Sequence, residues 1–174
     1  MNLYMIQIGF RLAGMNTEGH DTVFAIAKTK EDAFQQIKKK RPYTDHIDTC
    51  LEIHRVEDFE VRVREHATNE TLKLWFVNLG GYREGQYGEV HKCILVTAED
   101  LQTAKMKAKQ DPFFTEPGMV QDPVAAPHID DKHALEDGVD DVICINEELD
   151  EWGIELIENK QAPSNRLAIA YVPL

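Results

Sequence analysis

The stretch Leu3-Tyr4-Met5-Ile6-Gln7-Ile8-Gly9 returns 71 residues later as Leu74-Trp75-Phe76-Val77-Asn78-Leu79-Gly80. Residues 3–38 and 74–109 align without a gap at this spacing, and 8 of the 36 positions are identical. Hydrophobic positions also match between the identities. Self-similarity at a fixed spacing is typical of repeated structural units. The sequence therefore predicts that the chain contains two copies of one unit.

Each copy is predicted to run strand, long turn, strand, helix and further strand. The first strands, 3–9 and 74–80, are short apolar runs, which indicates burial on both faces. Second strands are expected at 22–27 and 93–98, and helices at 30–40 and 101–110. Thr29 followed three residues later by Asp32 is typical of a helix start, because the threonine oxygen can accept a backbone N–H there.

The later part of each copy is less regular. Residues 59–64 alternate with period two, which predicts a strand with one wet face, and residues 141–145 are interpreted as its counterpart. Residues 167–172 are predicted to form one more strand. We expect an α+β fold of two pseudo-repeated β-β-α-β(-β) units, with a mixed or antiparallel sheet and a pseudo-twofold relation. The sequence leaves open whether the copies share one sheet.

The predicted organisation has three parts. Residues 1–68 form the first repeat unit, residues 69–150 form the second, and residues 151–174 form a C-terminal extension with a final strand. His46-Ile47-Asp48 returns as His128-Ile129-Asp130 at a spacing of 82, so the second unit gains 11 residues, placed in an inserted loop near 112–127. The phenylalanine, glycine and proline content of that segment is typical of a surface loop.

Composition limits the class of protein. The 174 residues are 43% hydrophobic, which is enough for a core, and no apolar run approaches the roughly 18 residues that a membrane span needs. The three cysteines form no CxxC pair, which argues against a disulfide framework and a thiolate zinc site. These features predict a cytoplasmic protein without a membrane partner.

Charge is unevenly distributed. Residues 1–65 carry 10 Lys and Arg against 11 Asp and Glu, whereas residues 66–174 carry 9 against 20. Twelve acids lie in 130–158 with Lys132 as the one basic residue. Such a segment repels a phosphate backbone, so no nucleic-acid partner is expected. It is interpreted as a solvated surface, or as a docking surface for a basic protein partner or a divalent cation.

One polar pattern occurs in both copies: a Glu-x-His before the second strand and a His-Ile-Asp after the helix. Side chains two apart on an extended segment point the same way, so each pair can converge. Imidazole with carboxylate suits a divalent metal, or a general base oriented by an acid. The favoured interpretation is instead a structural role, in which the histidines anchor the preceding turn by hydrogen bonds. The candidate residues are Glu18, His20, His46, Asp48, Glu89, His91, His128 and Asp130.

Cys93 follows His91 by two residues and could form a thiolate–imidazole pair with it, although a buried, inert cysteine is the expected role. Trp75 lies in an apolar run and is expected in the core. Gly80-Gly81 is not followed by a helix, which argues against a nucleotide-binding loop, so no cofactor-binding residue is predicted.

These motifs resemble a bacterial family catalogued as domain of unknown function 1543, in two tandem copies. The matching stretches are Ile8-Gly9 through Glu18-Gly19-His20-Asp21, then His46-Ile47-Asp48, and Asn78-Leu79-Gly80-Gly81 through Glu89-Val90-His91. The likeness covers most of both halves. It implies a cytosolic bacterial protein. The family carries no assigned activity, so no catalytic residue can be transferred to this chain.

Three functional hypotheses follow. The leading one is a non-catalytic binding or assembly module, such as a homo-oligomer that pairs through strand edges. The second is a metal-dependent hydrolase that uses the histidine and carboxylate clusters. The third is a small-molecule sensor with a ligand cleft between the repeats. No feature of the sequence requires catalysis, so the catalytic residues are unknown and an enzyme is the less favoured class.

Overall fold

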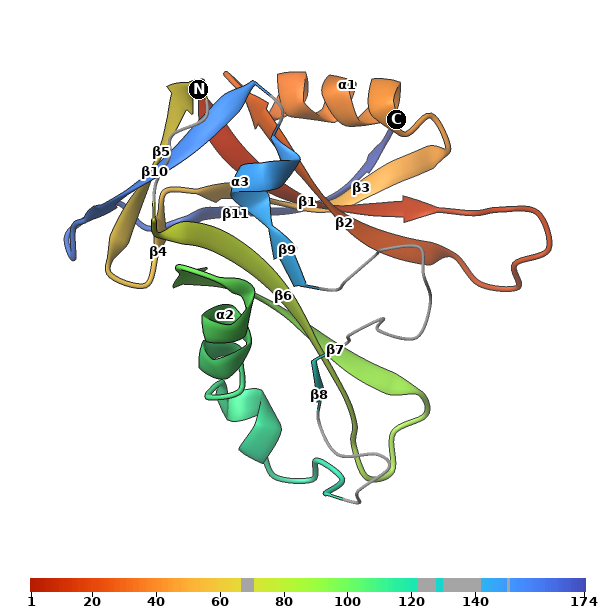
Figure 1. The fold of residues 1–174 in the computed structure, drawn as a ribbon. Helices are drawn as coiled ribbons and strands as arrows, with labels where there is room; N and C mark the ends of the chain where they lie inside the picture. The colour runs from red at the N-terminus through yellow and green to blue at the C-terminus, as the bar shows by residue number, and fades with distance from the viewer. Residues whose placement is uncertain (67–70, 122–127, 130–141, 150) are drawn as a thin grey trace. The chain divides into compact units, whose positions relative to one another are not determined.

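A computed structural model describes residues 1–66, 71–121, 128–129, 142–149 and 151–174, and divides the chain into two compact units (Figure 1). Unit 1 comprises Met1–Asn69 and Leu149–Leu174, and unit 2 comprises Glu70–Glu148. The fold is α+β, and the strand pairs of the described residues are antiparallel.

A four-stranded sheet with the order β11-β3-β1-β2 forms the body of unit 1. Its strands and the helix that packs on it are β1 (Asn2–Phe10), β2 (Gly19–Ala27), α1 (Lys30–Lys40), β3 (Thr44–Ile53) and β11 (Arg166–Pro173). Helix α1 lies along one face of this sheet (Figure 1). On that face Ala33, Phe34 and Ile37 of α1 join a core with Tyr4, Ile6, Ile8, Val23, Ala25, Ala27, Ile47 and Cys50.

Helix α1 begins where the sequence predicts. The Thr29 side chain accepts the backbone N–H of Asp32 at 3.1 Å, which confirms the predicted cap. Lysines 38, 39 and 40 occupy the last turn, where they offset the negative end of the helix dipole. The observed bounds, Lys30–Lys40, are those expected from the sequence.

A smaller sheet, ordered β10-β5-β4, completes unit 1. Its strands are β4 (Arg55–Val56), β5 (Phe59–Glu65) and β10 (Trp152–Glu158). Strand β10 pairs with β5 along its whole length, and β11 pairs with β3, although many residues separate the partners in sequence. These two pairings are the reason that Leu149–Leu174 belongs to unit 1.

In unit 2, strand β6 is central and pairs with β7, β8 and β9. The elements are β6 (Lys73–Tyr82), β7 (Glu89–Ala98), α2 (Leu101–Ala108), the 3-10 helix η1 (Pro112–Thr115), β8 (His128–Ile129), β9 (Val142–Cys144) and α3 (Ile145–Glu148). Trp75 is buried in the core, as predicted, and its indole N–H donates to the Ala98 carbonyl at 3.0 Å. The inserted segment supplies η1 and the buried Phe113, and its residues 122–127 lie outside the described ones.

The interpretation of residues 141–145 as the counterpart of the 59–64 strand is wrong. Within this stretch Val142–Cys144 forms β9, which pairs with β6, whereas β5 pairs with β10 and β4. Strand β9 has the place beside β6 that the end of β3 has beside β1. Trp75 pairs with Cys144, and Tyr4, which lies 71 residues earlier, pairs with Glu52. Burial of Val142 and Cys144 in the core of unit 2 accounts for this placement.

The expected burial of the first strand on both faces is also wrong in part. Tyr4, Ile6 and Ile8 are buried against α1, but Gln7 is exposed on the opposite face. That opposite face of the sheet is therefore partly open, and it carries polar side chains. Among the described residues no helix has the length and apolar character required to cross a membrane.

The two faces predict different responses to the same substitution. Ile6→Ala removes a side chain that is 0% exposed, and we expect it to lower the free energy of unfolding by about 2–5 kcal/mol. Ile169→Ala, in β11 of the same sheet, removes one that is 78% exposed, and we expect a change within about 0.5 kcal/mol. Urea unfolding followed by circular dichroism measures both. Equal losses would contradict this assignment of the core.

Candidate metal centre

Gly9 lies at the centre of the polar face, between two histidines on the neighbouring strands. The register places His20 of β2 and His46 of β3 directly opposite it. A Cβ atom added at Gly9 would lie 2.1 Å from Nε2 of His46 and 2.4 Å from its Cε1. The His46 ring therefore occupies the space that any other residue at position 9 would fill with its own side chain.

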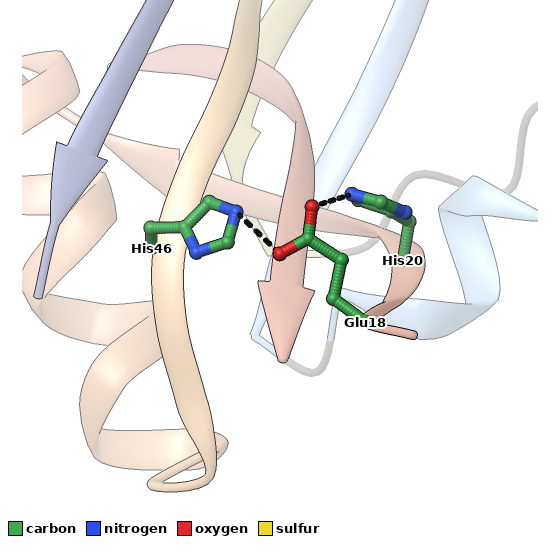
Figure 2. A group of neighbouring side chains, drawn as sticks. All are labelled: Glu18, His20 and His46. Carbon is green, nitrogen blue, oxygen red and sulfur yellow. Dashed lines mark ion pairs between the residues drawn. The ribbon is translucent and has the colours of Figure 1, made fainter. Parts of the chain in front are cut away.

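The two imidazoles meet two carboxylates above this glycine. Nε2 of His20 lies 3.5 Å from Oε1 of Glu18 and 3.4 Å from Oδ2 of Asp48. Nε2 of His46 lies 3.3 Å from Oδ1 of Asp48 and 4.0 Å from Oε2 of Glu18. Figure 2 shows the Glu18 carboxylate between the rings, with one oxygen toward each. We call Glu18, His20, His46 and Asp48 the unit 1 cluster.

A β-bulge brings Asp48 into this cluster. Across β1 and β3, Gln7 pairs with Thr49 and Ile8 pairs with Ile47, so Asp48 is an extra residue in the ladder. A bulge places two residues opposite one and redirects their side chains, and bulges are common beside functional sites. Asp48 reaches both histidines because of this irregularity, while the neighbouring Ile47 stays in the core.

Burial differs sharply between the four side chains. The His46 side chain is 4% exposed and that of Asp48 is 24% exposed, whereas His20 and Glu18 are 41% and 45% exposed. Among the described residues, neither ring nitrogen of His46 has a hydrogen-bond partner, and Oδ2 of Asp48 has none either. A buried polar group left in this state costs about 1–3 kcal/mol. His46 is therefore aimed into the cluster without the hydrogen bonds that a purely structural histidine would make.

Tyr171 covers the His46 ring. The two ring centroids lie 4.3 Å apart with an interplanar angle of 32°. Gly9 packs against the same imidazole, so the ring is held in one orientation by backbone and by an aromatic side chain. Neither Gly9 nor Tyr171 was among the sequence-predicted site residues. The repeated glycine at positions 9 and 80 could have indicated the first, but no local sequence signal indicates Tyr171.

The structure thus brings together the four predicted residues of the first copy, and Glu18, His20 and His46 place one ligand atom each within 4.8 Å of one another. In the second copy Nε2 of His91 lies 3.8 Å from Oε2 of Glu89. The backbone of His128 forms part of β8, its side chain is not described, and Asp130 lies outside the described residues.

The cysteines differ from expectation at one position. Cys93 was expected to be buried, but it is exposed on β7, while Cys50 and Cys144 are buried. The expectation is wrong because Cys93 faces Asn78 on the polar side of the unit 2 sheet rather than the apolar core. Burial raises the pKa of the Cys50 thiol to about 11 and also raises the pKa of Cys144.

Gly9 and His46 should show coupled energetics. Gly9→Ala introduces a Cβ that overlaps the His46 ring, so we expect it to destabilise the native protein far more than it destabilises the His46→Ala variant. A double-mutant cycle measured by urea unfolding should give a coupling free energy of about 0.5–3 kcal/mol. Additive effects of the two substitutions would show that the ring does not occupy the space above Gly9.

The thiols should differ in reactivity at pH 8. Only the thiolate reacts rapidly, so exposed Cys93 should be alkylated by iodoacetamide in the native protein, whereas buried Cys50 and Cys144 should not. Peptide mass spectrometry after timed labelling measures each site, and urea-unfolded protein provides the fully labelled control. Labelling of Cys50 as fast as that of Cys93 would contradict this prediction.

Comparison with known proteins gives information on the fold. No protein-family model matches this chain, and no curated protein sequence matches it. A crystal structure of a protein Il1583 from Idiomarina loihiensis superimposes with a TM-score of 0.66 at 22% sequence identity, covering 99% of this chain and 97% of the other. At this identity the similarity shows a shared fold and carries no functional assignment.

Proposed function

We propose that this chain is a binding module for a divalent transition metal, which unit 1 holds with Glu18, His20, His46 and Asp48. The observation that carries this proposal is the buried His46 ring, aimed at two carboxylates with neither nitrogen hydrogen-bonded among the described residues. A metal ion bound to Nε2 would supply a partner for that nitrogen. Imidazole nitrogen and carboxylate oxygen together suit zinc, manganese and iron.

The distances from the two ring nitrogens to the carboxylate oxygens are compatible with metal binding. Metal bonds of about 2.0–2.1 Å to nitrogen and oxygen put neighbouring tetrahedral ligands about 3.3–3.4 Å apart. Three of the four N···O distances in the unit 1 cluster are 3.3, 3.4 and 3.5 Å. The fourth, between His46 and Glu18, is 4.0 Å, and Glu18 has a half-exposed side chain that can adjust.

The number of ligands fits either a closed binding site or an open catalytic site. Structural zinc sites use four protein ligands, whereas catalytic sites use three and keep one position for water or substrate. Glu18, His20 and His46 offer three atoms within 4.8 Å of one another, and Asp48 adds a carboxylate beside both rings. One observation still favours a metal-dependent hydrolase as the second candidate: His20 and Glu18 are half exposed, so a small substrate has access to the site. Release of Glu18 from the metal would provide the open position.

Duplication of one ancestral unit is part of the same proposal. The β1–β2 and β6–β7 hairpins have the same register at a spacing of 71 residues, with Gly9 opposite His20 and Gly80 opposite His91. A helix follows each hairpin at the same spacing. These agreements support common descent of the two units. The resemblance to domain of unknown function 1543 supports the same origin.

The cellular setting is proposed from the sequence. A cytoplasmic bacterial protein fits the three cysteines, which form no disulfide, with Cys93 exposed and Cys50 and Cys144 buried. The acidic segment 130–158 opposes nucleic-acid binding and suits a basic protein partner. Assembly into a homo-oligomer through strand edges is compatible with β11, which pairs with β3 on one side and exposes Leu167, Ile169 and Tyr171.

Metal content tests the proposal directly. Tag-free protein, saturated with zinc and freed of excess, is measured by elemental mass spectrometry. His20→Ala should remove one zinc per chain, or weaken that site at least about tenfold, because it deletes an exposed ligand without disturbing the core. His54→Ala is the matched control, since His54 is in unit 1 and pairs with Glu52 instead.

Equal zinc content in wild type and His20→Ala would contradict the metal site of unit 1. The same samples distinguish the two candidate functions. A binding module leaves p-nitrophenyl ester and phosphate substrates intact, whereas a hydrolase cleaves one of them with zinc bound and loses this activity in His20→Ala.

A further inference from the structure

A small cavity lies within unit 1, beside the start of α1 and over strands β1, β3 and β11. Its volume is about 190 Å³. Pockets for drug-sized ligands measure about 300–1,000 Å³, so this cavity suits a ligand of only a few non-hydrogen atoms. The residues that line it include Tyr4, Lys30, Cys50, Glu52, Arg166 and Ala168.

The strand register explains why the five sheet residues of this cavity meet. Glu52 of β3 pairs with Tyr4 of β1 on one side and with Arg166 of β11 on the other. Cys50, two residues before Glu52, pairs with Ala168 of β11. Residues directly opposite each other share a face of a sheet, and so do residues two apart on one strand. Because Tyr4 and Cys50 pack in the core with α1, this face is the one that carries the helix.

The cavity has an uncharged side and a charged side. Cys50 is buried and Ala168 is half-buried, and burial raises the pKa of the Cys50 thiol to about 11, so that it stays neutral. Lys30 and Arg166 are exposed cations, whereas the side chain of Glu52 is 17% exposed. A ligand in this cavity therefore meets a small apolar surface together with charges of both signs.

The Glu52 carboxylate is largely buried but weakly paired. Its Oε1 lies 3.5 Å from Nε2 of His54, and its Oε2 lies 3.9 Å from Nη1 of Arg166. Among the described residues Nε2 of His54 has no hydrogen-bond partner, so the first contact is not a hydrogen bond, and the second is too long to be one. A ligand that donates hydrogen bonds to Glu52 would offset the cost of burying this carboxylate.

Tyr4 brings a hydrogen-bond donor to the same cavity. Its side chain is buried, and its hydroxyl oxygen accepts from Nδ2 of Asn2 at 3.4 Å. Burial raises the pKa of Tyr4, so the hydroxyl stays protonated at neutral pH. In the part of the chain that the structure describes, this hydroxyl donates to no other residue. Its proton is therefore available to an acceptor on a ligand.

We infer that this cavity binds a small α-amino acid as its zwitterion, with the ammonium group at Glu52 and the carboxylate at Lys30 and Arg166. A simple anion would be repelled by Glu52, and a simple cation would be repelled by the two basic side chains. A zwitterion places each of its charges beside the opposite one. The Tyr4 hydroxyl donates to the ligand carboxylate, and a small apolar side chain of the ligand packs against Cys50 and Ala168.

This site is separate from the metal of the proposed function. The cavity lies on the face of the sheet that carries α1, where Ile8 is buried, whereas Gly9 and the unit 1 cluster lie on the opposite face. Amino-acid binding at this cavity therefore requires no metal. Failure of either proposal leaves the other intact.

Isothermal titration calorimetry of the full-length chain with alanine, valine and leucine tests the inference. At least one of them should bind saturably, with a dissociation constant of about 1 mM or lower. Two analogues of the tightest binder then test its two charges: the deaminated acid lacks the ammonium group, and the amide lacks the carboxylate. Each should bind at least about tenfold more weakly, because it leaves charged groups of the cavity unpaired.

Two variants test the residues. Glu52→Gln keeps the size of the side chain and removes its charge, so it should weaken binding at least about tenfold. Arg166→Gln alters an exposed side chain, so the fold stays intact and binding should weaken about two- to fivefold. Glu65→Gln is the matched control, since it changes an exposed carboxylate of β5 in the same unit. Circular dichroism and zinc content check the fold and the unit 1 cluster in each variant.

The outcomes are distinct. Binding that is kept in Glu65→Gln and weakened in Glu52→Gln and Arg166→Gln supports the site, and Arg166→Gln decides alone if Glu52→Gln does not fold. Equal binding by these variants and wild type overturns it. A deaminated acid that binds as tightly as the amino acid overturns recognition of a zwitterion. No saturable binding of the three amino acids up to about 10 mM overturns the inference, while the zinc content of His20→Ala still tests the proposed function.

Discussion

The missing side chain of Gly9 is the constraint on which the rest of the unit 1 site depends. Adjacent strands lie about 4.8 Å apart, so side chains on β2 and β3 must reach across β1 to meet. The His46 ring does so by lying over Gly9, where a Cβ would come within 2.1 Å of its Nε2. A single alanine would close that space. The glycine is therefore a condition for bringing two imidazoles and two carboxylates together.

The two faces of the unit 1 sheet have different roles. One face packs Tyr4, Ile6 and Ile8 against α1 and supplies the burial that stabilises the unit. The opposite face is partly exposed and carries the side chains of the unit 1 cluster. Side chains alternate along a strand, so the packing of the apolar residues also fixes the positions of the polar residues that lie between them in sequence. The bulge at Asp48 is the exception to this alternation, and it adds a second carboxylate to the cluster.

The two units have the same hairpin register around a glycine. Strand β3 is continuous in unit 1, whereas its place beside β6 is shared by two short strands, β8 and β9, with residues 130–141 between them. In both units the glycine and the two histidines that flank it are direct partners across the strands.

Sequence alone was sufficient for the local structure and for the identity of four clustered residues. Repetition, apolar runs and the Thr29 cap predicted the hairpins and helices, and the spacing of Glu18 with His20 and of His46 with Asp48 predicted each pair. Only the tertiary structure brought the two pairs together, because their meeting depends on β1 lying between β2 and β3. It also decided the partners of β10 and β11, the place of β9, and the position of Tyr171 over His46. These contacts join segments distant in the chain, and no local pattern of residues encodes them.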